Sequence, residues 1–150
     1  MARRLQALSE EAARLASSLL SSAAEADRER RGRRFKAARN RQEVLQIVLE
    51  LRRLRGRFFA RPFSSGPAWD MLLDLAAARL GGRRIAVSSL CAGVDSSATT
   101  ALRWIRALVD KGLAARDSDP DDRRRIFIHL TPEGEKRMDD YLAAAQRLLG

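Results

Sequence analysis

Apolar residues recur at spacings of three and four along most of the chain, which is the spacing of one face of an α-helix. The first such stretch predicts a helix over residues 3–24, whose apolar seam consists of Leu5, Leu8, Ala12, Leu15 and Leu19. A single helix cannot bury a seam of this kind by itself. We therefore expect the seam to pack against another helix of this chain or of a second subunit.

A second helix is predicted over residues 35–57, after a break at Gly32. Its apolar positions form one stripe, made of Val44, Leu45, Ile47, Val48, Leu51, Leu54 and Phe58. The residues that follow, 58–67, include two prolines and a glycine and are expected to form a loop.

A third helix is predicted over residues 68–80, with an inward face made of Trp69, Leu72, Leu73, Ala76 and Leu80. The pair Gly81–Gly82 is a strong signal for the end of this helix. The short run Ile85–Val87 then predicts a strand, which can join a later hairpin as its third strand.

The stretch over residues 88–131 predicts two helices followed by a hairpin. The expected elements are a short helix at 88–92, a longer helix at 97–111, and strands at 113–116 and 125–130. Gly112 stands where a helix C-terminal cap belongs, and Pro120 lies in the charged tip of the hairpin. This order of elements, a helix, a turn, a second helix and a charged hairpin, is one by which proteins present a helix to duplex DNA.

A final helix is predicted to start at Thr131 and Pro132, a hydroxyl cap followed by proline in the first turn. Its apolar stripe consists of Met138, Tyr141, Leu142, Ala145, Leu148 and Leu149. Because the first and last helices both carry apolar faces, we expect them to meet in a dimer interface; packing within one chain is the alternative.

The longer helix of the central stretch has two different faces. The face expected to pack inward consists of Ala98, Ala101, Leu102, Ile105, Leu108 and Val109. The opposite face is small, hydroxylated and basic, with Ser96, Thr100, Arg103 and Ala107 flanked by Thr99 and Arg106. Threonine and arginine can contact base edges and phosphates, and the helix start adds free N–H groups. The alternative is an ordinary amphipathic helix whose polar face meets water.

The hairpin tip, residues 118–125, turns at Asp119–Pro120 and then delivers three consecutive arginines. An arginine on a thin hairpin can enter a narrow minor groove, where the potential is most negative. Asp121 and Asp122 could pair with the neighbouring arginines and hold the tip in one shape. A surface charge cluster is the alternative interpretation.

Charge supports an acidic polymer as the partner. The chain has 29 Lys and Arg against 19 Asp and Glu, a formal net charge of +10, and nearly all of the positive charge is arginine. Residues 25–57 contribute twelve basic and five acidic residues, so they hold most of the excess. This arginine-rich segment is either a solvated helix face or an accessory contact with phosphates.

Three runs of the sequence together resemble the MarR-type winged-helix transcriptional regulators. They are TTALRWIRALVDKGL at 99–113, DPDDRR at 119–124 and LTPEG at 130–134, within a resemblance that covers about residues 68–150. The resemblance implies a bacterial, dimeric protein that reads palindromic operators, with a recognition helix in the major groove and a wing in the minor groove. Two positions depart from the family pattern, because Leu102 replaces a frequent hydroxyl residue and Ser96 replaces a common apolar one.

Carried over residue by residue, the resemblance places Thr99, Thr100 and Arg103 in the major groove. Arg123 or Arg124 would be the arginine of the wing, and Asp122 the acid that braces it. The complete set of expected DNA-binding residues is Ser97, Thr99, Thr100, Arg103, Arg106, Arg123 and Arg124.

The predicted fold is therefore mainly α with a small β-wing: a winged helix-turn-helix flanked by long N-terminal helices and a C-terminal helix. Residues 1–57 are expected to be an arginine-rich helical extension for dimerisation or accessory contacts, residues 58–130 the DNA-binding domain, and residues 131–150 a dimerisation helix. The expected function is sequence-specific regulation of transcription as a homodimer on duplex DNA. The alternatives are a winged-helix scaffold for protein interactions, and a non-specific binder of nucleic acid or anionic surfaces through residues 25–57.

Other chemistry is not expected. One cysteine and one histidine, Cys91 and His129, cannot supply a zinc site, and the paired acids do not suggest a catalytic dyad. We expect Cys91 to be a buried, inert thiol and His129 to point to solvent. No enzymatic activity, metal or cofactor is predicted; a small-molecule effector is left open. The lone cysteine and the lack of a long apolar run favour a cytoplasmic protein without membrane attachment.

Overall fold

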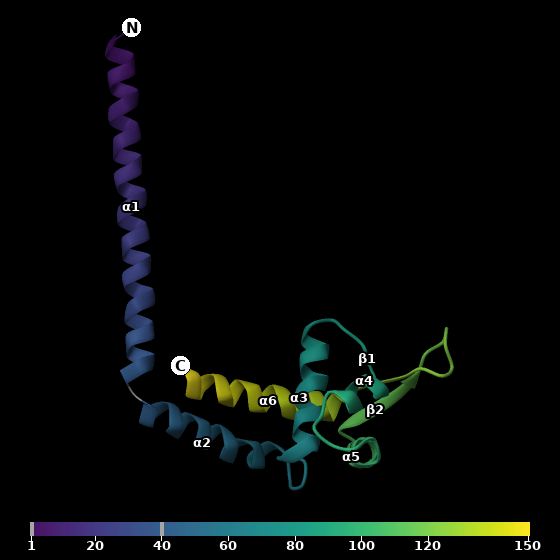
Figure 1. Cartoon of the computed structure of the whole chain (residues 1–150). Helices are drawn as coiled ribbons and strands as arrows, with labels where there is room; N and C mark the ends of the chain where they lie inside the picture. The colour runs from purple at the N-terminus through teal and green to yellow at the C-terminus, as the bar shows by residue number, and fades with distance from the viewer. Residues whose placement is uncertain (1, 40) are drawn as a thin grey trace. The chain divides into compact units, whose positions relative to one another are not determined.

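The computed structural model describes the backbone of residues 2–39 and 41–150, and the side chains of residues 6, 9–30 and 41–150. Contacts divide the chain into two compact units, Met1–Gln46 and Ile47–Gly150. The elements, labelled in Figure 1, are α1 (Ala2–Arg39), α2 (Arg41–Phe58), α3 (Gly66–Leu80), β1 (Ile85–Ala86), α4 (Val87–Ala92), α5 (Ala98–Asp110), β2 (Ala114–Ser118), β3 (Ile126–Leu130) and α6 (Pro132–Leu149). No helix in the described part of the chain is both long and apolar enough to cross a bilayer.

Helix α1 is longer than the sequence pattern predicts, because Gly32 does not end it. A single glycine costs a helix about 1 kcal/mol, which the good helix formers around it outweigh. Leu15 and Leu19 of the predicted seam are 62% and 71% exposed. The side chains of Leu5 and Leu8 lie outside the described residues, and the partner of this seam stays a prediction.

Helix α2 buries its apolar stripe only toward its C-terminal end. Leu54 is buried, Leu51 and Phe58 are half-buried, and Val44, Leu45 and Val48 are exposed. The loop after α2 contributes to the hydrophobic core, because Phe59 and Phe63 are both buried in it. The end of α2 and α6 therefore share one core with the winged helix.

Helix α3 lies at the centre of this core and contacts β3, α5 and α6. Trp69, Leu72 and Ala76 are buried as predicted, but the inward placement of Leu73 and Leu80 was wrong, because both are exposed. Met71 and Leu75 are buried in their place. A helix with neighbours on several sides buries residues against each of them. Its buried surface is therefore wider than a single apolar stripe of the sequence and is rotated relative to that stripe.

The three strands form an antiparallel sheet in the order β1-β3-β2, which confirms the predicted third strand. The register pairs Ala86 with Phe127, and Ala114 with Leu130. Ile128 and Leu130 of β3 face the core, and His129 between them is exposed, as predicted. Nδ1 of His129 lies 3.1 Å from a carboxylate oxygen of Asp117.

The start of α6 is joined tightly to the segment that follows α5. Thr131 accepts a hydrogen bond from the N–H of Gly134 and donates one to the carbonyl of Gly112. A Cβ on Gly134 would lie 2.1 Å from the carbonyl oxygen of Leu113, so only glycine fits there. Further along α6, Met138, Tyr141 and Ala145 are buried as predicted, whereas Leu148 and Leu149 are exposed.

Candidate nucleic-acid interface

Helix α5 begins at a cap built by two of the predicted site residues. Ser97 Oγ accepts a hydrogen bond from the backbone N–H of Thr100 at 3.2 Å and donates one to Thr100 Oγ1 at 2.9 Å. Thr100 is half-buried and Ser97 is exposed. These two hydroxyl groups therefore hold the start of the helix, whatever else they contact.

The outward face of α5 differs in part from the prediction. Thr99, Arg103 and Arg106 are exposed, as expected for residues that contact a partner. The inward placement of Leu102 and Ala98 was wrong, because Leu102 is 50% exposed and Ala98 is exposed as well. Only the narrow stripe of Ala101, Ile105 and Leu108 is fully buried against the neighbouring helices. Thr99, Leu102, Arg103 and Arg106 consequently form one continuous exposed face at helical spacing.

The tip of the wing is held by hydrogen bonds to its backbone. The N–H of Asp119 donates to the carbonyl of Arg125 at 3.0 Å, which closes the loop. The side chains of Asp119 and Asp122 accept from the backbone N–H groups of Asp121 and Arg124, at 2.9 and 3.0 Å. The tip is therefore held by hydrogen bonds to its backbone, and not by the expected pairing of Asp121 and Asp122 with guanidinium groups. Asp122 accepts its hydrogen bond from the backbone N–H of Arg124. The guanidinium groups of Arg123 and Arg124 are exposed.

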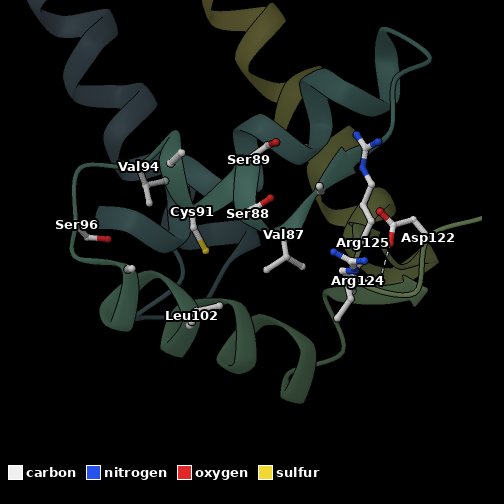
Figure 2. A pocket seen from close by; sticks show the side chains of 14 residues that line it. Val87, Ser88, Ser89, Cys91, Val94, Ser96, Leu102, Asp122, Arg124 and Arg125 are labelled. Carbon is white, nitrogen blue, oxygen red and sulfur yellow. Dashed lines mark hydrogen bonds between the residues drawn. The ribbon is translucent and has the colours of Figure 1, made fainter. Parts of the chain in front are cut away.

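Helix α5 and the wing border one concavity of about 970 Å³. Figure 2 shows Leu102 of α5 on one side of it, Arg124 and Asp122 of the wing on another, and Val87, Ser88 and Cys91 of α4 between them. Its apolar lining includes Val87, Cys91, Val94, Leu102 and Ile126, and its wing side holds Arg124 and Arg125 beside Asp122. The predicted recognition helix and the predicted wing thus flank the same hollow.

The one thiol of this region is that of Cys91. Cys91 is half-buried, where full burial was expected, because it lines the concavity. Partial burial still raises the pKa of its thiol, so the group stays protonated at neutral pH. Among the described residues, no group of three or more histidine, cysteine, aspartate or glutamate side chains is placed to hold a metal ion.

One basic cluster beside the wing was not predicted from the sequence. The Arg84 guanidinium carbon lies 4.0 Å from the centre of the Phe127 ring, and that of Arg125 lies 5.0 Å from it. The signal that could have found this cluster is weak: an arginine just before β1, and an arginine two residues before a phenylalanine of β3. Only the pairing of β1 with β3 brings these residues together.

Comparison with known proteins places this geometry among DNA-binding folds. Residues 77–134 match the family model of the winged helix DNA-binding domain. Over 47 residues the chain is 38% identical to a protein assigned to transcriptional regulation of the hcr operon in Thauera aromatica. That match covers 31% of this chain and 28% of the relative, so the matched segment spans little more than a quarter of the relative's length.

Solved structures share the fold at low sequence identity. A mutant of MepR from S. aureus, bound to an oligodeoxyribonucleotide, has a TM-score of 0.57 and 20% identity over 71% of this chain and 75% of that one. YusO from Bacillus subtilis has a TM-score of 0.54 and 21% identity, over 84% and 80%. MarR has a TM-score of 0.50 and 23% identity, over 71% and 74%. The predicted fold class, mainly helical with a small β-wing, is confirmed.

Proposed function

We propose that this chain, a MarR-type winged-helix protein by its fold, binds duplex DNA in a sequence-specific manner and regulates transcription. The observation that supports this most directly is the shared concavity. An exposed face of α5 and an arginine-bearing wing border one hollow, which is how an element for the major groove and one for the adjacent minor groove must be placed. The bound oligodeoxyribonucleotide of the MepR mutant agrees with this proposal.

Helix α5 is the proposed reading element. Arg103 and Arg106 are exposed on the same face as Thr99, so they can donate to guanine edges or phosphates while the threonine contacts a base edge or a methyl group. Ser97 and Thr100 cap the helix start, where free N–H groups favour a phosphate. The exposed Leu102 adds an apolar contact to this face, which suits a thymine methyl.

The wing is the proposed minor-groove element. Arg123 and Arg124 extend from a loop whose backbone is fixed, and neither guanidinium lies in an ion pair with the described residues. Fixing the loop lowers the entropy lost when an arginine enters the groove. Asp122 serves this function through the backbone of Arg124.

A homodimer completes the proposal. The exposed leucines of α1 and the exposed end of α6, which includes Leu148 and Leu149, are apolar surfaces that a second copy could cover. Two copies related by a two-fold axis would place their α5 helices one turn of DNA apart, about 34 Å. A palindromic binding site with that spacing is the expected target.

The test is a selection of bound sequences from random duplex DNA, followed by anisotropy titrations on the enriched duplex. Arg103→Ala should weaken binding by about tenfold or more and relax the preference at one position of each half-site. Arg124→Ala should weaken binding and lower the slope of log K against log salt by about 0.9 for each lost phosphate contact. Lys136→Ala removes the same charge from an exposed position of α6 and is the matched control.

Two outcomes would contradict the proposal. If the selection enriches no sequence, the chain is a non-specific binder or a scaffold for protein interactions. If an enriched duplex binds the Arg103 and Arg124 variants as tightly as the Lys136 variant, α5 and the wing are not the reading surface.

A further inference from the structure

Phe127 lies on the side of β3 that faces away from Ile128 and Leu130, yet it is only 8% exposed. Two guanidinium groups lie over its ring, at 4.0 Å for Arg84 and 5.0 Å for Arg125. Phe127 is not part of the main hydrophobic core. These two arginine side chains are thus held in place by an aromatic ring at the root of the wing.

A guanidinium that stacks on a ring uses its flat face, so the N–H groups along its edge stay free to donate. Arg84 and Arg125 lie in no ion pair with the described part of the chain, and neither does the neighbouring Arg83. These three arginines line one small hollow, which is also lined by one carboxylate, that of Asp74. Three cations around one acid leave a net positive charge in this hollow, and the Phe127 ring holds two of the three guanidinium groups.

This hollow, of about 380 Å³, adjoins the large concavity between α5 and the wing. The two share Ala86, Ser89 and Arg125 as lining residues. In Figure 2 the side chains of Arg124 and Arg125 leave the wing in different directions. Arg124 lines the large concavity, and Arg125 lines both the large concavity and the small hollow, the latter with Arg83 and Arg84. The consecutive arginines of the wing therefore serve two neighbouring surfaces.

The backbone strand that separates a major groove from the adjacent minor groove must pass between the elements that occupy those grooves. With α5 in one groove and the wing in the other, this strand would cross the large concavity, and the small hollow adjoins that concavity through Ala86, Ser89 and Arg125. The geometry points to a phosphate site formed by Arg83, Arg84 and Arg125, which binds the DNA backbone on the flank of the groove that the wing occupies. The inference rests on the proposed function and extends its contact surface beyond α5 and the tip of the wing.

The test compares variants of Arg84 on the selected duplex. Arg84→Met keeps an unbranched apolar chain over Phe127 and removes the charge, whereas Arg84→Lys keeps the charge. The Met variant should bind about tenfold more weakly and lower the salt slope by about 0.9, and the Lys variant should keep the slope. Lys136→Met is the control for the loss of one positive charge. Arg83→Gln, at a residue that does not stack on Phe127, gives a second reading if Arg84→Met fails to fold.

The length of the duplex distinguishes backbone contact from a general charge effect. A duplex that ends at the groove contacted by the wing should bind the wild-type chain as weakly as the longer duplex binds the Met variant. The Met variant should lose little further affinity on the short duplex. Equal losses for both proteins on shortening would overturn the site. A second result would also overturn it. If shortening the duplex has no effect, and inorganic phosphate displaces the duplex from wild type more readily than from the Met variant at matched ionic strength, the cluster holds a free anion and not the DNA backbone.

Failure of this site and failure of the proposed function give different results. If the wild-type chain binds the selected duplex and is sensitive to Arg103→Ala, but Arg84→Met and Arg83→Gln match Lys136→Met, only the phosphate site is overturned. If the wild-type chain enriches no duplex at all, the proposed function fails and the phosphate site fails with it.

Discussion

The carboxylate of Asp122 accepts a hydrogen bond from the backbone N–H of Arg124 at 3.0 Å, inside the tip of the wing. This bond shapes the loop from which the wing arginines extend, and it requires an acceptor at residue 122 but no charge. Asp122→Asn should therefore keep the shape and bind DNA at least as tightly as wild type, since one repulsive charge is lost. Asp122→Ala should weaken binding about five- to tenfold, because the loop must then be ordered on binding.

Anisotropy titrations of both variants on the same duplex check this prediction. Equal affinities of the Asn and Ala variants would show that the hydrogen bond does not organise the wing.

Leu102 and Leu108 lie on the same helix in opposite environments. Leu108 is fully buried, so Leu108→Ala should lower the free energy of unfolding by about 2–5 kcal/mol. Leu102 is 50% exposed, so Leu102→Ala should cost less than about 1 kcal/mol and act mainly on DNA binding. Urea unfolding followed by circular dichroism measures both, and similar losses for the two variants would contradict the outward position of Leu102.

Gly134 and Gly56 give a matched pair of glycine-to-alanine substitutions within helices. A Cβ on Gly134 would meet the carbonyl oxygen of Leu113 at 2.1 Å, so Gly134→Ala should destabilise the protein by about 3 kcal/mol or more. Gly56 has no heavy atom within 4 Å of its Cβ position. Gly56→Ala should stabilise the protein by up to about 1 kcal/mol, from helix propensity. Opposite signs in the two unfolding curves are the expected result.

The Arg79 guanidinium donates to both carboxylate oxygens of Asp139, at 2.8 and 3.1 Å, and joins α3 to α6. This hydrogen bond lowers the pKa of Asp139 below its ordinary value of 3.8. The stability that the pair contributes is therefore fully present above that ordinary value and is lost as pH falls through the lowered pKa. Asp139→Asn and Arg79→Gln should each flatten the dependence of stability on pH in this acid range.

The double variant provides the control, because no pair is left to remove. If Asp139→Asn changes the acid limb as much in the Arg79→Gln background as in wild type, the arginine is not the partner that lowers the pKa. Thermal unfolding between about pH 2 and pH 5 gives the required curves.

The central stretch could be predicted from the sequence because its signals are local. Ser97 and Thr131 cap their helices, Gly112 ends one with a φ of +75°, and strand alternation places Ile128 and Leu130 in the core. The ordered runs that resemble the MarR-type regulators lie in this stretch, and the winged-helix fold that the resemblance implies is confirmed by the family match over residues 77–134 and by the shared fold. The glycine of the Leu-Thr-Pro-x-Gly run also has a physical cause, the close approach of Leu113.

The remaining features depend on contacts between distant residues. Periodicity identifies an apolar face but not the number of neighbours that cover it, so it places Leu73, Leu80 and Leu102 inward although they are exposed. In the same way, nothing local in the sequence shows that Arg84 and Arg125 meet over Phe127, because that requires the register of β1 on β3.

The joint at Thr131 and Gly134 has a mechanical consequence. The hydroxyl of Thr131 bonds the carbonyl of Gly112, its N–H bonds the carbonyl of Leu113, and Gly134 rests on that same carbonyl. These contacts fix the start of α6 directly to the segment that follows α5. A change in the position of α6 at this joint would therefore be passed to the backbone of Gly112 and Leu113, next to the C-terminal end of α5.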